Sequence, residues 1–220
     1  MHQDQARFGS SPKLPQIQSA FAPAALQPIA TIRPVRREQT IIEQNSEGDS
    51  WYCVISGAAR QFTINPEGRR QIVDILLPGD FFGFGPDNHA RFAVQAITDG
   101  TIIARYPGLQ LEALANSDPR VARELRDRLS GTVARLQEQI LLVSTMTATQ
   151  KVRAFLFYMI GRHPSGDEDT TYLPMSRYDI ADQLGISVET VSRSITDLQS
   201  AGVIELAGPR TIGITPEAKG

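Results

Sequence analysis

Short hydrophobic runs separated by turn residues fill the first half of the chain beyond about residue 30. The strand-like runs are residues 40–42, 50–56, 60–64, 71–76, 92–97 and 101–106. Turn signals such as Asn-Pro-Glu-Gly at 65–68 and Pro-Gly-Asp at 78–80 lie between them. Short strands at a spacing of roughly 8–12 residues with such turns indicate an antiparallel barrel or sandwich. We therefore expect an antiparallel β-roll from about Ile32 to Tyr106.

A helical period replaces this pattern after Asn116. Ser117 or Asp118 can cap a helix whose first position suits Pro119. Apolar or small residues then recur at steps of three and four, at Leu125, Leu129, Thr132 or Val133, Leu136, Ile140 and Val143. A helix of about 27 residues is ~40 Å long, more than one small β-roll covers. The period favours a homodimer that pairs along residues 119–145 over a helix that simply lies on the roll.

The last third of the chain predicts a compact helical unit that ends in a hairpin. Residues 146–149 look like a hinge, 150–162 like an apolar helix, 163–166 like its break and 167–171 like a polar loop. Residues 176–184 then predict a capped helix, Gly185 a turn at positive φ, and Ser187 the cap of a second helix at 188–199. Two helices joined by such a turn are typical of a helix-turn-helix. Residues 203–206 and 210–214 form the expected hairpin, or wing.

The second helix of this motif carries the candidate DNA-reading residues. Arg193 can donate two hydrogen bonds to a guanine, Glu189 can accept one from a cytosine amino group, and Ser192 can face a thymine. The full candidate set is Arg177, Ser187, Glu189, Thr190, Ser192, Arg193 and Thr196, with Ser187 or Thr190 suited to hold phosphate. The alternative is that Glu189 and Arg193, one helical turn apart, form only a surface salt bridge. Their place on the groove-entering helix favours base readout.

Composition excludes several classes of protein. No apolar stretch approaches the ~18 residues of a membrane span, and residues 1–20 lack the apolar core of a secretory signal, so we expect a flexible tail there and a cytoplasmic protein. A single cysteine excludes a disulfide framework and a cysteine cage for zinc or an iron–sulfur cluster. His2, His89 and His163 are scattered, so no metal site is expected.

The charge distribution agrees only partly with DNA binding. The chain has 22 Lys+Arg against 24 Asp+Glu, a formal net charge of −2. Residues 175–214 hold three arginines against five carboxylates, whereas residues 119–162 hold eight basic residues against three acidic ones. With few phosphate-neutralising groups on the predicted reading unit, we expect weak non-specific affinity and a larger share for base contacts.

The segment 175–214, MSRYDIADQLGISVETVSRSITDLQSAGVIEL…GPRTIGI, resembles the DNA-binding domain of the Crp–Fnr family of bacterial transcription regulators. The order of roll, Leu-Pro-Gly-Asp turn at 77–80, long helix, hinge and winged helix-turn-helix is similar to that family over about residues 30–215. Glu189-x-x-Ser192-Arg193 resembles the Fnr and FixK type of recognition helix. This resemblance implies TTGA-containing inverted repeats, an activator's contact with RNA polymerase, and a cyclic-nucleotide-binding-like roll.

The resemblance leaves the effector open. Phe84 stands where cyclic-nucleotide-binding relatives have the ribose-binding glutamate, Phe92 rather than Ser or Thr follows Arg91, and Leu136-Gln137 falls where they have Thr-Ser. We therefore disfavour a cyclic nucleotide, although Arg91 remains a possible anion contact. The cysteine cluster of Fnr-type sensors is absent, and a lone His89 makes a poor haem site.

Two further alternatives concern Cys53 and the absence of any effector. Cys53 alternates with its strand neighbours and is more typical of a small buried hydrophobic residue than of a redox switch. The resemblance to the FixK branch is also consistent with a regulator that binds no ligand and is controlled through its own expression. The competing hypothesis is a family member that responds to a cyclic nucleotide, to haem and gas, or to a redox signal through Cys53.

Other classes of function explain less of the sequence. Metal-dependent enzymes with a related β-fold need several histidines and a carboxylate inside the barrel, and only His89 lies in this one, so we expect no enzyme. A pure dimerisation protein leaves the second helix and the wing without a role. The chain is thus predicted to be α+β, with a flexible tail (1–20), a β-roll sensor-like domain (21–118), a dimerisation helix (119–146) and a winged helix-turn-helix domain (147–220).

Overall fold

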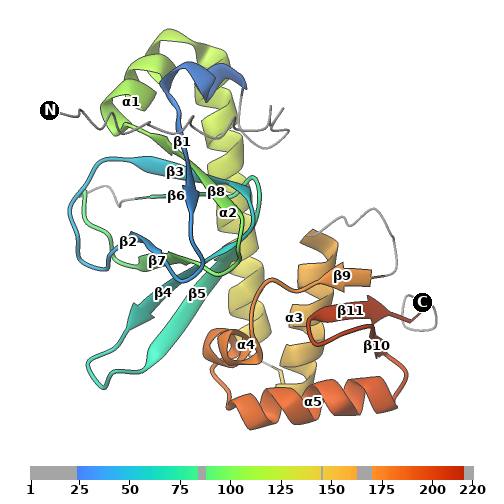
Figure 1. The fold of residues 1–220 in the computed structure, drawn as a ribbon. Helices are drawn as coiled ribbons and strands as arrows, with labels where there is room; N and C mark the ends of the chain where they lie inside the picture. Colours follow the sequence, from blue (N-terminus) through green and yellow to red (C-terminus); the bar gives the residue numbers. More distant parts are fainter. Residues whose placement is uncertain (1–23, 84–87, 145, 163–169, 216–220) are drawn as a thin grey trace, which may run out of the picture.

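The computed structural model describes residues 24–83, 88–144, 146–162 and 170–215, without the side chains of 142–144. Several predicted features lie outside the described residues: the tail with His2, Phe84, the side chain of Val143 and the helix break at 163–166. Figure 1 shows the β-roll beside the long helix α2 (Pro119–Ser144), which runs down to the helices of the C-terminal part. In Figure 1 the hairpin of β4 (Ala59–Ile64) and β5 (Arg70–Leu76) extends downward from the roll, and β5 contacts α4 (Arg177–Leu184) of the C-terminal part.

Two four-stranded antiparallel sheets form the roll, which confirms the expected antiparallel architecture, and two of their strands, residues 31–35 and 81–83, were not among the predicted runs. One sheet has the order β1-β8-β3-β6 and the other β2-β7-β4-β5. The remaining strands are β1 (Thr31–Val35), β2 (Thr40–Ile42), β3 (Trp51–Ser56), β6 (Phe81–Gly83), β7 (Ala93–Ala96) and β8 (Thr101–Tyr106), preceded by a 3₁₀ helix, η1 (Ala24–Ile29). Apolar side chains from both sheets fill the interior, where the Tyr52 and Phe82 rings stack at 5.3 Å.

The long helix begins where the sequence predicted and packs along the roll by one side only. Asp118 caps it, since its Oδ1 accepts from the Arg120 N–H at 2.9 Å, and Pro119 is its first residue. Val121 is buried against the roll, and Arg135 pairs with Asp74 of β5 at 2.7 Å. The helix α1 (Gly108–Ser117), which precedes it, was not predicted.

The C-terminal part contains α3 (Ala148–Arg162), α4 (Arg177–Leu184), α5 (Val188–Ser200) and a three-stranded sheet. The wing strands β10 (Ile204–Leu206) and β11 (Thr211–Ile214) are joined by β9 (Thr170–Tyr172), which pairs with β11. The prediction of a polar loop at 167–171 is wrong for Thr170 and Thr171. These residues become a strand because a partner some 40 residues later supplies the hydrogen bonds, which no local pattern reveals.

One apolar core joins the roll to the C-terminal part. Ile72 and Ile75 of β5 belong to the same buried cluster as Phe155 of α3 and Leu184 of α4. The side chain of Arg162 adds a bond to the Ile75 carbonyl at 3.0 Å. The C-terminal part is therefore held against the roll as well as tethered to it through α2.

Candidate nucleic-acid interface

The helix-turn-helix is built by α4, a tight turn and α5. Ser176 and Asp179 form a reciprocal cap at the start of α4, and Gly185 ends that helix at φ +65°, a left-handed conformation that favours glycine. Ser187 caps α5, because its hydroxyl accepts from the Thr190 N–H at 3.2 Å. The apolar spacing predicts a buried inner face, and six of its residues are buried: Ile180, Ala181, Leu184, Val191, Ile195 and Leu198. Ile186, expected on the same face, is only half-buried.

The candidate DNA-reading residues lie together on this motif. Ser187, Glu189, Arg193 and Thr196 are exposed on α5 or at its start, Thr190 and Ser192 are half-buried there, and Arg177 is exposed at the first position of α4. Two hydroxyls already have partners inside the helix. Thr196 donates to the Ser192 carbonyl at 3.1 Å, and the Thr190 hydroxyl lies 3.0 Å from that of Ser187.

Glu189 and Arg193 are not bound to each other. No ion pair within 4.0 Å joins them in the part of the chain that the structure describes. Hydrogen bonds from the Glu189 backbone N–H and the Ser187 hydroxyl, helped by the charge of Arg193, lower the pKa of Glu189. The carboxylate is therefore an ionised acceptor at neutral pH, and the exposed Arg193 guanidinium is available as a donor.

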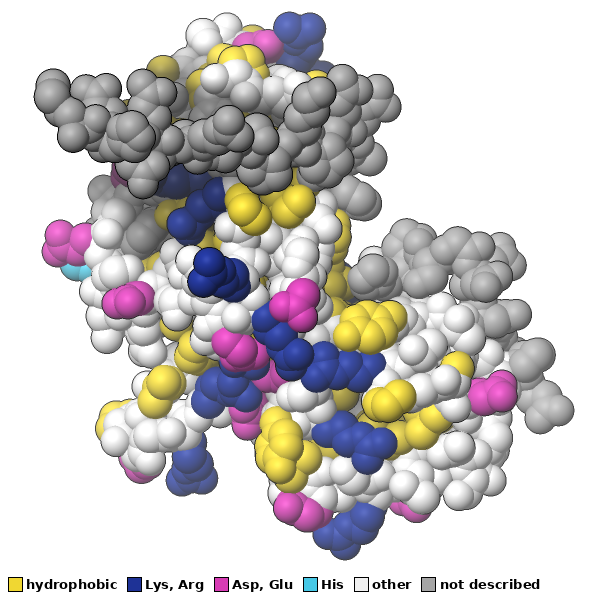
Figure 2. All heavy atoms as spheres, viewed as in Figure 1, with side chains coloured by type: hydrophobic (Ala, Val, Ile, Leu, Met, Phe, Trp, Pro, Cys, Tyr) yellow, Lys and Arg dark blue, Asp and Glu magenta, His cyan; other side chains and the backbone are white. Residues whose placement is uncertain are grey.

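Ion pairs connect this motif to the roll, and sequence reasoning missed them. Arg60 and Arg70, on β4 and β5, bind Asp179 Oδ1 at 2.9 and 3.0 Å, and Arg70 also binds Asp182 at 2.7 Å. Figure 2 shows basic and acidic side chains gathered where the roll meets the C-terminal part. The partners are 109 to 119 residues apart in sequence, so no spacing signal exists for them.

Asp179 is ionised at this junction despite its burial. Burial alone raises the pKa of its carboxyl, but hydrogen bonds from Ser176 and the charges of Arg60 and Arg70 outweigh that effect and leave the pKa below its ordinary value. The side chains of Arg60 and Asp179 are only 9% and 4% exposed. The junction therefore holds a buried, charged contact between the roll and α4.

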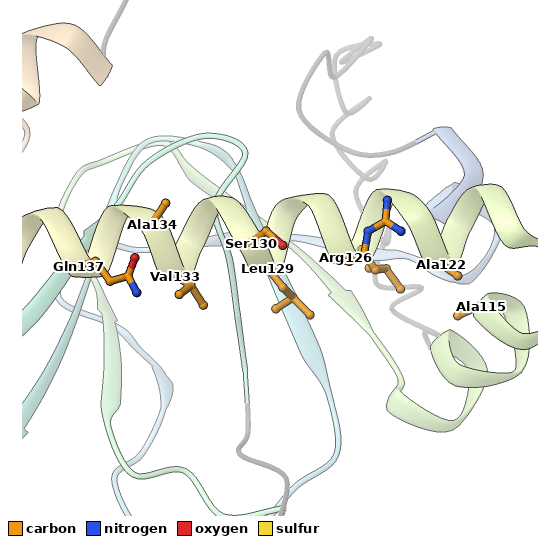
Figure 3. A pocket seen from close by; sticks show the side chains of 9 residues that line it. Ala115, Ala122, Arg126, Leu129, Ser130, Val133, Ala134 and Gln137 are labelled. Carbon is orange, nitrogen blue, oxygen red and sulfur yellow. The ribbon is translucent and has the colours of Figure 1, made fainter.

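A second surface feature is an apolar stripe on the side of α2 that does not face the roll. Leu129, Val133 and Ile140 are 43%, 54% and 66% exposed. Figure 3 shows Leu129 and Val133 on the same side of the helix, between Ala122 and Gln137. Leu125, by contrast, is half-buried, and Arg135 and Gln139 face Asp74 of the roll.

The remaining candidate residues lie in or on the roll. Burial in β3 raises the pKa of the Cys53 thiol to about 12. Arg91 is exposed next to buried Ala90. Phe84, at the position of the ribose-binding glutamate of cyclic-nucleotide-binding relatives, lies outside the described residues. Within the described ranges, no group of three or more His, Cys, Asp or Glu is placed to hold a metal, and no helix is long and apolar enough to cross a membrane.

Comparison with known proteins decides the family. A cyclic nucleotide-binding domain model matches residues 32–118, and a Crp-like helix-turn-helix domain model matches residues 150–219. The chain is 37% identical over 191 residues to the nitrogen fixation regulation protein FixK of Rhizobium meliloti (strain 1021), covering 86% of this chain and 84% of that protein. The chain belongs to the Crp–Fnr family of bacterial transcription regulators. It is a DNA-binding transcription regulator with a FixK-like sequence, and it is not an enzyme.

Two further similarities agree with this membership of the Crp–Fnr family. The transcriptional activatory protein AadR of Rhodopseudomonas palustris is 36% identical over 169 residues, which are 76% of this chain and 70% of AadR. The structure of FixK2 from Bradyrhizobium japonicum superposes with a TM-score of 0.79 at 33% identity, covering 87% of this chain and 95% of that one. The order of roll, long helix and helix-turn-helix is thus shared by a solved FixK structure.

Proposed function

We propose that this regulator works in the cytoplasm as a homodimeric transcription activator that binds TTGA-type inverted repeats without a small-molecule effector. The four parts expected from the sequence (1–20, 21–118, 119–146 and 147–220) then act as tail, sensor-like roll, dimer helix and DNA-binding domain. The similar protein AadR is named a transcriptional activatory protein. For the present chain, activation is assigned to contact with RNA polymerase.

The outer face of α5 carries the proposal for sequence reading. Arg193 is exposed and unpaired with Glu189 among the described residues, so it can donate two hydrogen bonds to a guanine. The ionised Glu189 can accept from a cytosine amino group, and Ser192 lies between them in sequence on the same helix. Arg177, Ser187, Thr190 and Thr196 are assigned to the backbone and groove edges around these base contacts.

The exposed stripe on α2 supports the homodimer. Leu129, Val133 and Ile140 recur at helical spacing on a face that the roll does not cover, and a second copy of the same helix would bury them. Pairing along residues 119–145 places two copies of α5 for adjacent major grooves, ~34 Å apart on B-DNA. Each copy then reads one half of the repeat.

The packing of the roll supports function without an effector. Apolar side chains from both sheets fill the interior, and three polar side chains of α2 have partners in the roll. Arg135 binds Asp74 at 2.7 Å, Arg128 binds the Gly79 carbonyl at 3.2 Å, and Gln139 binds Asp74 at 3.1 Å. The buried Tyr106 hydroxyl, packed against α2, has no hydrogen-bond partner among the described residues, but a single phenol does not make the set of converging donors that an anion site needs.

Titration of the purified, ligand-free protein against fluorescent duplexes under reducing conditions tests the proposal. One duplex carries a TTGAT/ATCAA inverted repeat and the other a scrambled sequence of the same composition. We expect tight binding to the repeat only. Weak and equal binding to both duplexes would contradict effector-free binding, and oxidation of the same sample would then test Cys53. Transcription from a promoter carrying the repeat, with and without the protein, separates an activator from a repressor.

A further inference from the structure

The tip of the β4–β5 hairpin lies beside the start of the recognition helix. A groove of ≈ 520 Å³ at the hairpin is lined by Asn65 and Arg69 on one side and by Gly185, Ile186 and Ser187 on the other. Arg69 belongs to the roll, whereas Ser187 is the N-cap of α5. A residue of the roll thus borders the end of the helix that carries the DNA-reading residues.

The hairpin is fixed to the reading unit on its inner side. Arg70 binds Asp179 and Asp182 of α4, and Gln71 donates to the Asp182 carbonyl at 2.6 Å. Together with Arg60, Arg70 pairs with two of the five carboxylates of residues 175–214, and these two positive charges offset the net charge of −2 of that segment. The roll therefore supplies positive charge that the reading unit lacks.

Arg69, the neighbour of Arg70 in the hairpin, takes no part in these bonds to α4. Its side chain is exposed, and its guanidinium makes no hydrogen bond or ion pair within the described residues. Its backbone is held in a closed turn, since its N–H donates to Asn65 Oδ1 at 2.8 Å and its carbonyl accepts from the Asn65 N–H at 3.0 Å. Gly68, at φ +76°, completes that turn. An exposed cation on a fixed turn suits a rigid anionic surface.

We propose that the β4–β5 hairpin is part of the DNA-binding surface and that Arg69 contacts a backbone phosphate beside the groove that α5 enters. The inference rests on the proposed docking of α5. The N-terminal residues of a recognition helix contact base edges, so a neighbour of Ser187 faces the sugar–phosphate strand that borders the groove. Arginine contacts to phosphate position a protein on DNA and carry no sequence information.

The salt dependence of binding tests this contact, measured with the full-length protein on the repeat and scrambled duplexes. Each phosphate contact contributes about 0.9 to the slope of log K against log[salt], so Arg69→Gln is expected to lower that slope by about 2 for a dimer. Affinity for both duplexes falls by the same factor, and the ratio between them stays constant. Arg69→Lys retains the charge and most of the slope. Arg123→Gln, which removes an exposed arginine of α2, leaves the slope unchanged.

The outcomes separate this inference from the proposed function. If the wild-type protein does not prefer the repeat, the proposed sequence reading is wrong. If it does, and Arg69→Gln has the wild-type slope, the hairpin contact is wrong while the proposed function stands. A change in the ratio between the duplexes would also overturn the assignment to a phosphate, because it would indicate a base contact.

Discussion

At the scale of single residues, Arg193 is the side chain on which sequence-specific binding depends most. We expect Arg193→Ala to weaken binding to the TTGA repeat by about 1–3 kcal/mol per half-site and to relax discrimination against the scrambled duplex. Arg177→Ala is the matched control, because an exposed arginine at the start of α4 is suited to contact phosphate. Its removal should weaken binding to the repeat and to the scrambled duplex by the same factor. Unchanged affinity of Arg193→Ala for the repeat would refute the role assigned to this residue.

The buried thiol of Cys53 makes a second prediction at this scale. Burial in β3 raises its pKa to about 12, so almost no thiolate exists at pH 8 and the native thiol should resist alkylation. We expect iodoacetamide to modify Cys53 only in urea, as measured by mass spectrometry. Mild oxidation should leave DNA binding unchanged, and Cys53→Ser should bind as tightly as the wild-type protein. Fast alkylation of the native protein would revive the redox hypothesis.

At the scale of elements, the exposed stripe of α2 predicts how the dimer can be broken. Val133→Lys places a charge where two copies of the helix are proposed to meet, and we expect a monomer that binds the full repeat at least tenfold more weakly. Glu138→Lys introduces the same side chain on the opposite side of α2, where it is exposed, and should remain dimeric. Sedimentation measures both. A dimeric Val133→Lys protein would place the interface elsewhere.

Local periods predicted most elements, and the failures have physical reasons. Strand alternation and turn residues predicted the bounds of β2 and β8. Capping chemistry predicted the start of α2 and the caps Ser176 and Ser187. The helix α1 was missed because Pro107 precedes it and no side chain caps it. The strand β9 was missed because three polar residues become a strand only when β11 pairs with them.

At the scale of the whole molecule, the candidate site could be predicted only in part. Residues of α5 share one short segment, so helical spacing placed Glu189, Ser192 and Arg193 on one face. The contacts of Arg60 and Arg70 with α4 depend on how the roll folds back on the C-terminal part, and sequence neighbours carry no trace of that arrangement. The same long-range packing brings Arg69 to the edge of the reading surface.

Asp179 connects these two parts of the molecule, and its ionisation makes the connection sensitive to acid. Its folded-state pKa lies below the ordinary value, so the native state binds fewer protons than the unfolded chain. Its contribution to stability is therefore complete above the unfolded pKa of about 4 and is lost as the pH falls through the folded pKa. Asp179→Asn lacks this ionisation but retains an oxygen that can accept from Ser176.

We expect Asp179→Asn to lower the free energy of unfolding at pH 7 by about 3 kcal/mol, because Arg60 stays buried with one carboxylate fewer. The low end of the range for broken buried pairs applies, since Glu38 still contacts Arg60. Measured by urea unfolding, the difference in the free energy of unfolding between the wild-type protein and Asp179→Asn should become smaller between about pH 5 and pH 3. Asp127→Asn, which removes an exposed carboxylate of α2 paired with Arg126, should change stability by less than about 1 kcal/mol. A difference that stays constant down to pH 3 would mean that the stability lost in Asp179→Asn does not come from the ionisation of Asp179.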